Sequence, residues 1–137
     1  MKHFKLSEVR IFCISLKDAQ ARRQSILEMK HNLGLDLEFV DAIDGRSRSK
    51  EEIQAATTRK IKWNSLNGHR DEISKPTEAA CSISHIKAWE RLISEGLDQA
   101  IVLEDDVFCS TNDGVELVLS AEFAYADSSS GISKVYI

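Results

Sequence analysis

The sequence has few cysteines and no long apolar run, and each absence narrows the class of protein. Its three cysteines, Cys13, Cys81 and Cys109, are odd in number and widely spaced, without a CxxC pair. This pattern predicts free, mostly buried thiols in a reducing compartment rather than a disulfide framework. No apolar run approaches the ~20 residues of a membrane-spanning helix. No signal-peptide core follows the basic N-terminus, so we expect a cytoplasmic protein.

The sequence also lacks a large excess of one charge. Its formal net charge of −4 does not identify a partner, and we expect no nucleic-acid binding. The distribution is nevertheless uneven. Residues 46–75 hold eight Lys or Arg against four acids, whereas residues 98–137 hold eight acids and one Lys. A basic middle and an acidic end can place an anionic ligand and a metal side by side.

The 137 residues, 42% hydrophobic and 29% charged, suit one modest globular domain with a core. Periodicity predicts strands over 9–15, 37–40, 100–103 and 132–137 and helices over 19–33, 50–56, 78–95 and 113–124. Residues 57–75 form a long irregular segment between them. The expected helix boundaries are the N-caps Asp18, Ser49 (in a capping box with Glu52) and Thr77, and the terminal glycines Gly34 and Gly96. Such alternation predicts an α/β fold with a mostly parallel, doubly wound sheet.

The strongest helical pattern, over 78–95, places Cys81, His85, Trp89 and Leu92 on one face. Glu78, Cys81 and His85 also share metal-ligand spacing, which would suit zinc. A cysteine and a histidine beside tryptophan and leucine are more often core residues, so the core interpretation is favoured over the zinc site.

Two arginines, Arg22 and Arg23, fall in the first turns of the helix predicted over 19–33. Cations are unfavourable there, because the helix dipole is positive at its N-terminus. Either both side chains are solvated at a small cost, or they bind an anion such as a diphosphate.

The sequence Ala100-Ile101-Val102-Leu103 runs directly into Glu104-Asp105-Asp106. Carboxylates at the end of a buried strand must remain outside the core, and in open α/β sheets ligands bind at that end. The cluster is therefore either a divalent-metal site or a solvated acidic turn. Likewise, the stretch from Asp41 to Gly45 after the second strand is either a tight turn or a ligand-contacting loop.

Four stretches together resemble glycosyltransferase family 25, the lipooligosaccharide galactosyltransferase-like enzymes. They are Ile14-Ser15-Leu16 followed by Arg22-Arg23, Asp41-Ala42-Ile43-Asp44-Gly45, Glu78-Ala79-Ala80-Cys81-Ser82-Ile83-Ser84-His85, and Leu103-Glu104-Asp105-Asp106-Val107. The resemblance implies a GT-A-like fold and the inverting transfer of a sugar, expected to be galactose, from a UDP-sugar to a lipooligosaccharide or other glycan. It further implies a cytoplasmic enzyme, with peripheral association at the inner face of the membrane.

On this resemblance, Glu104-Asp105-Asp106 corresponds to the DXD metal motif. Glu104 and Asp106 would hold Mn²⁺ or Mg²⁺, hard cations that prefer oxygen ligands. The implied nucleotide-sugar-binding residues are Ser15, Leu16, Arg22, Arg23, Asp41, Asp44, Ser84, His85 and Asp105.

The chain departs from the family pattern at two positions and in length. The family usually has glycine where this chain has Thr77 and Ala80, and the Ala80 methyl either packs harmlessly or crowds the donor site. Family domains continue beyond the strand predicted at 132–137, so we expect residues 1–137 to be one glycosyltransferase domain, incomplete at its C-terminal end, with the general base beyond it. The alternative is a catalytically incomplete nucleotide-sugar-binding or assembly module, self-associating through an open sheet edge.

Overall fold

The computed structural model describes residues 3–5, 8–63, 73, 75–107, 116–118 and 134–136 of the chain. Its elements, in order, are β1 (His3–Lys5), β2 (Ile11–Ser15), α1 (Gln20–Leu33), β3 (Leu37–Asp41), α2 (Lys50–Ala55), α3 (Pro76–Ser94), β4 (Gln99–Glu104), β5 (Glu116–Val118) and β6 (Lys134–Tyr136).

Four strands form one sheet in the order β3-β2-β4-β6, and every neighbouring pair is parallel. In the register, Ser15 of β2 lies opposite Asp41 of β3, and Ile14 lies opposite Glu104 of β4. The strands β1 and β5 form a separate antiparallel pair. The predicted parallel α/β architecture is therefore confirmed.

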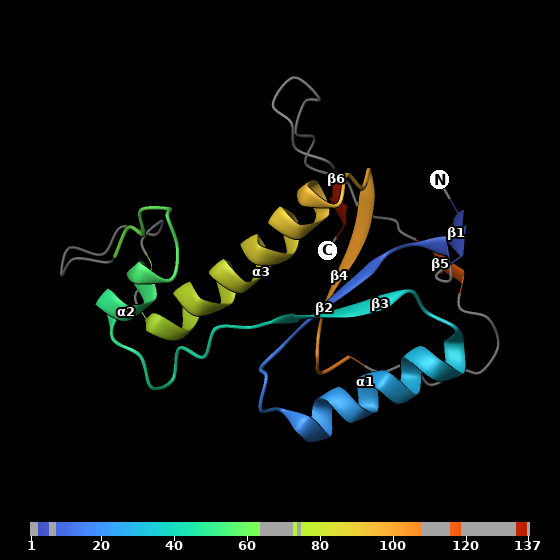
Figure 1. The fold of residues 1–137 in the computed structure, drawn as a ribbon, viewed down its shortest axis with the longest axis horizontal. Helices are drawn as coiled ribbons and strands as arrows, with labels where there is room; N and C mark the ends of the chain where they lie inside the picture. Colours follow the sequence, from blue (N-terminus) through green and yellow to red (C-terminus); the bar gives the residue numbers. More distant parts are fainter. Residues whose placement is uncertain are drawn as a thin grey trace.

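Helices cover both faces of this sheet, with α1 on one side and α3 on the other (Figure 1). All five residues of β2 are buried, as expected for a strand packed on both faces. The cluster facing α3 contains Phe12, Ile14, Val40, Ala88, Leu92, Ala100 and Val102. The cluster facing α1 contains Ile11, Cys13, Ile26, Leu35 and Leu37. A third cluster, of Ile53, Ala79, Ala80 and Ile83, joins α2 to α3.

Several predicted helix boundaries are confirmed. Gly34 and Gly96 both adopt positive φ angles, of 62° and 65°, which terminate α1 and α3. Ser49 and Glu52 form the predicted capping box at α2.

Two predicted N-caps are wrong. Helix α1 is preceded by a turn in which the Ala19 amide donates to the Leu16 carbonyl, so Ala19 rather than Asp18 is the N-cap. Helix α3 begins at Pro76, whose missing N–H and fixed φ suit the first helical position, so Lys75 rather than Thr77 precedes it.

The helix predicted over 113–124 is also wrong where it can be compared, because Glu116–Val118 forms strand β5. This segment pairs with β1, an unpredicted strand more than 100 residues earlier, and a local sequence pattern cannot report such a partner. The strand predicted over 132–137 is confirmed as β6, which pairs with β4. Cys109 and positions 64–72 and 74 of the predicted irregular segment lie outside the described residues.

The buried face of α3 differs from the predicted one. It consists of Ala79, Ala80, Ile83, Ser84, Ala88 and Leu92. Cys81 is exposed, contrary to the expectation of mostly buried thiols, whereas Cys13 is buried as expected. Ala80 is buried against α2 and does not line the pocket described below, so its methyl group packs harmlessly.

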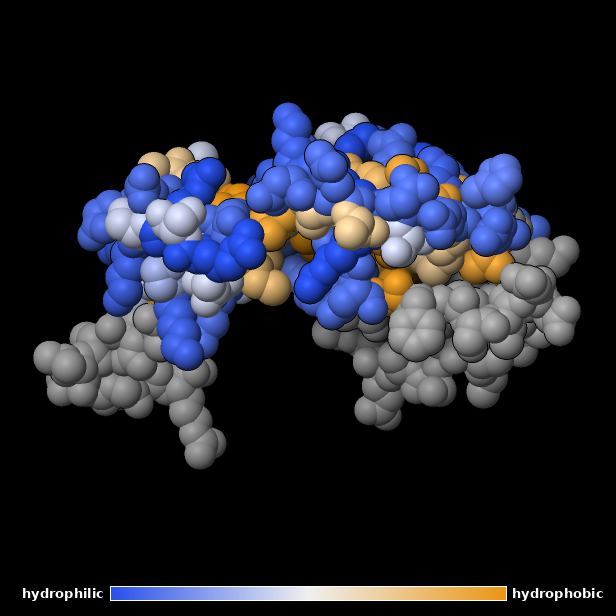
Figure 2. Space-filling model, turned by 90° about the horizontal axis from the view of Figure 1, so that it is seen from below, coloured by the Kyte–Doolittle hydropathy of each residue, from blue (hydrophilic) through white to orange (hydrophobic). Residues whose placement is uncertain are grey.

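Hydrophilic residues cover most of the coloured surface in Figure 2, and apolar residues show between them in the middle of the molecule and in smaller patches on the larger part. No helix in the described part of the chain is both long and apolar enough to cross a membrane.

Gly45 allows the loop after β3 to lie directly against the start of α3. A Cβ atom at this position would lie 2.7 Å from the Pro76 carbonyl oxygen and 2.7 Å from the Thr77 Cα atom. Because both atoms belong to the backbone, Gly45→Ala should lower the free energy of unfolding by about 1–3 kcal/mol, the usual cost of overpacking. Urea denaturation measures this loss.

The matched control is Ser47→Ala, which changes an exposed residue two positions away. It should alter the free energy of unfolding by less than about 0.5 kcal/mol. Equal stability of Gly45→Ala and the wild type would contradict the close contact between the loop and α3.

Candidate functional site

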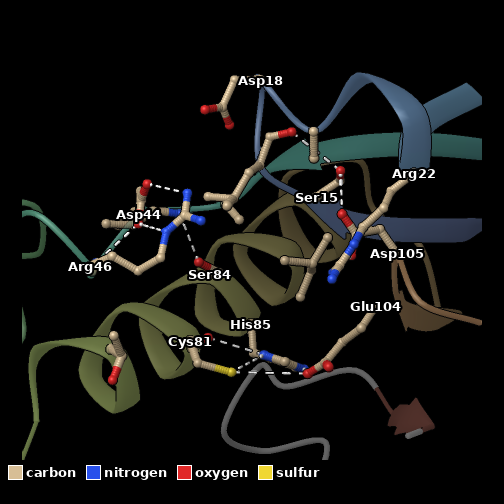
Figure 3. A pocket seen from close by; sticks show the side chains of 17 residues that line it. Ser15, Asp18, Arg22, Asp44, Arg46, Cys81, Ser84, His85, Glu104 and Asp105 are labelled. Carbon is tan, nitrogen blue, oxygen red and sulfur yellow. Dashed lines mark hydrogen bonds and ion pairs between the residues drawn. The ribbon is translucent and has the colours of Figure 1, made fainter.

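A cavity of about 480 Å³ opens where β2 and β4 end, beside the loop after β3 and one side of α3 (Figure 3). Its wall includes eight of the residues predicted from the family resemblance: Ser15, Leu16, Arg22, Asp44, Ser84, His85, Glu104 and Asp105. The remaining three, Arg23, Asp41 and Asp106, do not line it. The parallel register explains this gathering, because the carboxyl ends of neighbouring parallel strands share one edge of the sheet.

Asp105 is held by two side chains from the other side of the pocket. The Ser15 hydroxyl donates to its Oδ2 at 2.7 Å, and Arg22 Nη1 donates to its Oδ1 at 3.0 Å (Figure 3). The Asp105 side chain is only 11% exposed, whereas Arg22 is 63% exposed. The middle carboxylate of the acidic motif is thus neutralised by the protein itself.

Arg23, the next residue of α1, donates hydrogen bonds to backbone and carboxylate oxygens. Its guanidinium donates to the carbonyl oxygens of Ser15 and Leu16 and, at 2.6 Å, to Asp41 Oδ1. It also stacks over the Phe39 ring, with 4.7 Å to the centroid. The hydrogen bond from Arg23 holds the pKa of Asp41 below its usual range. Arg23 therefore positions the ends of β2 and β3.

Glu104 and Asp106 are the two exposed carboxylates of the motif. Glu104 Oε1 lies 3.9 Å from Cys81 Sγ and 3.7 Å from His85 Nε2. Although Cys81 is exposed as a residue, partial desolvation of its thiol, reinforced by the negative charge of Glu104, raises the pKa of that thiol. Asp106 makes no ion pair with any residue that the structure describes, so both carboxylates retain oxygens for a hard cation.

Asp44 and Arg46 form a second charged pair on the wall. Arg46 donates to Asp44 Oδ1 at 2.9 Å and to Oδ2 at 2.7 Å, and these hydrogen bonds lower the pKa of Asp44 to about 2. Arg46 was not singled out from the sequence. The feature that could have indicated it is its position: Arg46 is the first cation of the basic segment 46–75 and directly follows the Asp41–Gly45 stretch.

Ser84 ties the loop after β3 to α3. Its buried hydroxyl donates to the Ala80 carbonyl oxygen at 2.7 Å and accepts from the Ile43 amide at 3.0 Å. Lys87 Nζ reaches the Asp41 carbonyl oxygen at 2.6 Å. The hydroxyl of Ser84 is occupied by these bonds, so it shapes the wall rather than offering a free group to a ligand.

The wall therefore combines an exposed cation, Arg22, with the carboxylate of Glu104 and the imidazole of His85. A diphosphate needs cationic and N–H donors, and a divalent metal needs carboxylate oxygens. The cavity offers a cation and carboxylate oxygens together, at the carboxyl ends of the parallel strands.

Comparisons with known proteins identify relatives of this chain. Residues 8–129 match the family model described as glycosyltransferase family 25 (LPS biosynthesis protein). A glycosyltransferase 25 family member from Aedes aegypti is 31% identical over 118 residues, which are 78% of this chain and 19% of that protein.

Two vertebrate relatives are similar at the same level. Procollagen galactosyltransferase 2 from Mus musculus is 32% identical over 103 residues, 71% of this chain and 15% of that protein. A probable inactive glycosyltransferase 25 family member 3 from Bos taurus is 32% identical over 106 residues, 74% of this chain and 17% of that protein. The chain thus spans less than a fifth of the length of these relatives. On the match over 8–129, the chain belongs to glycosyltransferase family 25.

Proposed function

We propose that this chain forms the donor-binding part of a metal-dependent glycosyltransferase that moves a sugar from a UDP-sugar to a glycan acceptor. The observation that carries the proposal is the gathering of Arg22, Glu104 and Asp105 on one pocket where the parallel strands end. Family membership supports the reaction class, and the pocket supplies groups that suit its substrate.

Glu104 and Asp106 would hold Mn²⁺ or Mg²⁺ in this proposal. Both side chains are exposed carboxylates, which fits the oxygen preference of these cations. Asp105 fits less well, because Ser15 and Arg22 already occupy its two oxygens. The bound cation would neutralise the negative charge that develops on the departing diphosphate.

Arg22 would bind the diphosphate directly. One of its nitrogens donates to Asp105, and the rest of its exposed guanidinium faces the cavity (Figure 3). The position of Arg22 early in α1 adds the favourable end of the helix dipole for an anion. Arg23 has the different role of fixing Ser15 and Asp41, because its Nε and Nη2 already donate to the Leu16 and Ser15 carbonyl oxygens and to Asp41.

We propose galactose as the sugar, since a similar protein is named procollagen galactosyltransferase 2. A lipooligosaccharide acceptor, a cytoplasmic location and self-association through a sheet edge remain predictions from the sequence.

A second candidate function is nucleotide-sugar binding without turnover. The specific observation in its favour is the similarity to a probable inactive family member, whose identity to this chain equals that of the galactosyltransferase. Both functions need the same donor pocket, so they differ only in the chemical step.

Calorimetry with UDP tests donor binding. UDP should bind in the presence of Mn²⁺ and release little or no heat without it, because the cation offsets repulsion between diphosphate and carboxylates. Asp106→Ala should weaken Mn²⁺-dependent binding by at least about tenfold, since changes beyond the direct ligands already cost about 10–100-fold.

Asp98→Ala is the matched control, because Asp98 is an exposed carboxylate just before β4. Its UDP affinity should equal that of the wild type. An absence of heat with UDP and Mn²⁺, or an Asp106→Ala variant that binds normally, would refute the proposed metal-dependent donor site.

Arg22→Ala should weaken UDP binding by about tenfold or more, because a hydrogen bond to a charged group contributes about 1.5–3 kcal/mol. Fluorescence anisotropy with a labelled UDP measures the change, and Arg59→Ala, which removes an exposed arginine that does not line the pocket, is its control. A lower melting temperature with unchanged UDP affinity would instead assign Arg22 solely to holding Asp105.

Turnover separates the two candidate functions. UDP release from UDP-galactose in the presence of Mn²⁺ and a galactosyl acceptor, above the buffer rate and lost in Asp106→Ala, is the result expected for a transferase. UDP binding without any release supports the binding module and excludes transfer by this chain alone.

A further inference from the structure

Three potential metal ligands meet at one corner of the pocket: Cys81 and His85 from α3, and Glu104 from the end of β4 (Figure 3). One ligand atom from each lies within 4.8 Å of the other two. Cys81 and His85 are four residues apart and therefore project from the same side of the helix. The predicted grouping had Glu78 as the carboxylate, whereas the structure places Glu104 there.

The orientation of His85 suits metal binding. Its Nδ1 lies 3.1 Å from the Cys81 carbonyl oxygen, a contact that suits a protonated Nδ1, and 3.9 Å from Cys81 Sγ. Its other nitrogen, Nε2, lies 3.7 Å from Glu104 Oε1. Histidine ligands in metalloproteins commonly donate their second nitrogen to a backbone carbonyl in this way.

Hydrogen bonds can hold the same three groups without a metal. The Cys81 thiol donates to Glu104 Oε1 across 3.9 Å, and a proton on His85 Nε2 would pair the imidazole with the same carboxylate. A divalent cation would replace these protons and bind the thiolate, the imidazole and the carboxylate together. A decisive test therefore needs a signal that only a metal gives.

We propose that Cys81, His85 and Glu104 bind a thiophilic divalent cation, Zn²⁺, at this corner of the pocket. A tetrahedral zinc ion with ligand bonds of about 2.0–2.3 Å separates its ligand atoms by about 3.4–3.6 Å. The two separations from Glu104 Oε1, 3.7 and 3.9 Å, need to contract by only a few tenths of an ångström. Three protein ligands leave the fourth position open toward the cavity.

The ligand set distinguishes this site from the proposed Mn²⁺ or Mg²⁺ site. Thiolate and imidazole favour zinc, whereas carboxylate oxygens alone favour the hard cations. Glu104 belongs to both sets, and one carboxylate cannot point in both directions. Zinc at this site therefore competes with Mn²⁺-dependent UDP binding, a consequence that rests on the proposed function.

Titration with Co²⁺, a spectroscopic substitute for Zn²⁺, tests the site directly. The wild type should develop the intense visible bands of tetrahedral cobalt and a sulfur-to-cobalt charge-transfer band, and Zn²⁺ should abolish both. Cys81→Ser should lose the charge-transfer band and weaken Zn²⁺ affinity by at least about 100-fold, since second-shell changes alone cost about 10–100-fold. His85→Gln should lose the tetrahedral bands.

Two controls assign the signal. Cys109→Ser removes another thiol of the chain, and Ser82→Ala changes an exposed neighbour on α3, so both should keep the wild-type spectrum. Pale octahedral cobalt spectra in the wild type, or a charge-transfer band that survives Cys81→Ser, would overturn the proposal. Far-ultraviolet circular dichroism of each variant verifies that the fold is retained.

Competition provides the second readout. Zn²⁺ should weaken Mn²⁺-dependent UDP binding in the wild type by about tenfold or more at saturation and should lose this effect in Cys81→Ser. If the wild type fails to bind UDP with Mn²⁺, the proposed function fails while the cobalt spectrum still decides the zinc site. Tetrahedral cobalt together with undiminished UDP affinity would overturn the competition.

Discussion

The burial of β2 between two parallel neighbours is the constraint on which the rest of the structure depends. All five of its residues are buried, with one face toward α1 and the other toward α3. A slip of one residue would exchange those faces, so the register is strongly specified. That register sets Ser15 opposite Asp41 and Ile14 opposite Glu104. The packing of the core thereby decides which polar side chains meet at the edge of the sheet.

The start of α1 connects the neighbours of β2. Cations in the first turns of a helix oppose its dipole, but here carboxylates that follow the adjacent strands compensate for them. Arg22 reaches Asp105 beyond β4, and Arg23 reaches Asp41 at the end of β3. These exposed or half-exposed ion pairs contribute little stability individually. Their effect is geometric, because among the residues that the structure describes neither arginine pairs with Glu104 or Asp106, the other two acids of the motif.

Patterns within single elements could be read from the sequence, whereas contacts between distant elements could not. Glycines, a capping box and a continuous apolar run correctly predicted α1, α2, α3 and β4, because these signals are local. Strand β5 was missed because its partner β1 lies far away in the sequence. The sequence identified the three acids as a candidate site. Only the fold shows that Ser15 and Arg22 pair with Asp105, and that Glu104 lines the pocket whereas Asp106 does not. The meeting of Cys81 and His85 with Glu104 likewise depends on how α3 packs against the sheet.

The loop after β3 contacts α3 at three points. Gly45 packs on Thr77, the Ile43 amide bonds to Ser84, and the Asp41 carbonyl accepts from Lys87. A segment without regular structure thus has the fixed geometry of the helix beneath it. A ligand that contacts this wall meets a surface that is already ordered, and it loses little conformational entropy there on binding. Selection between ligands at this wall then follows from its shape in the free protein, with little contribution from induced fit.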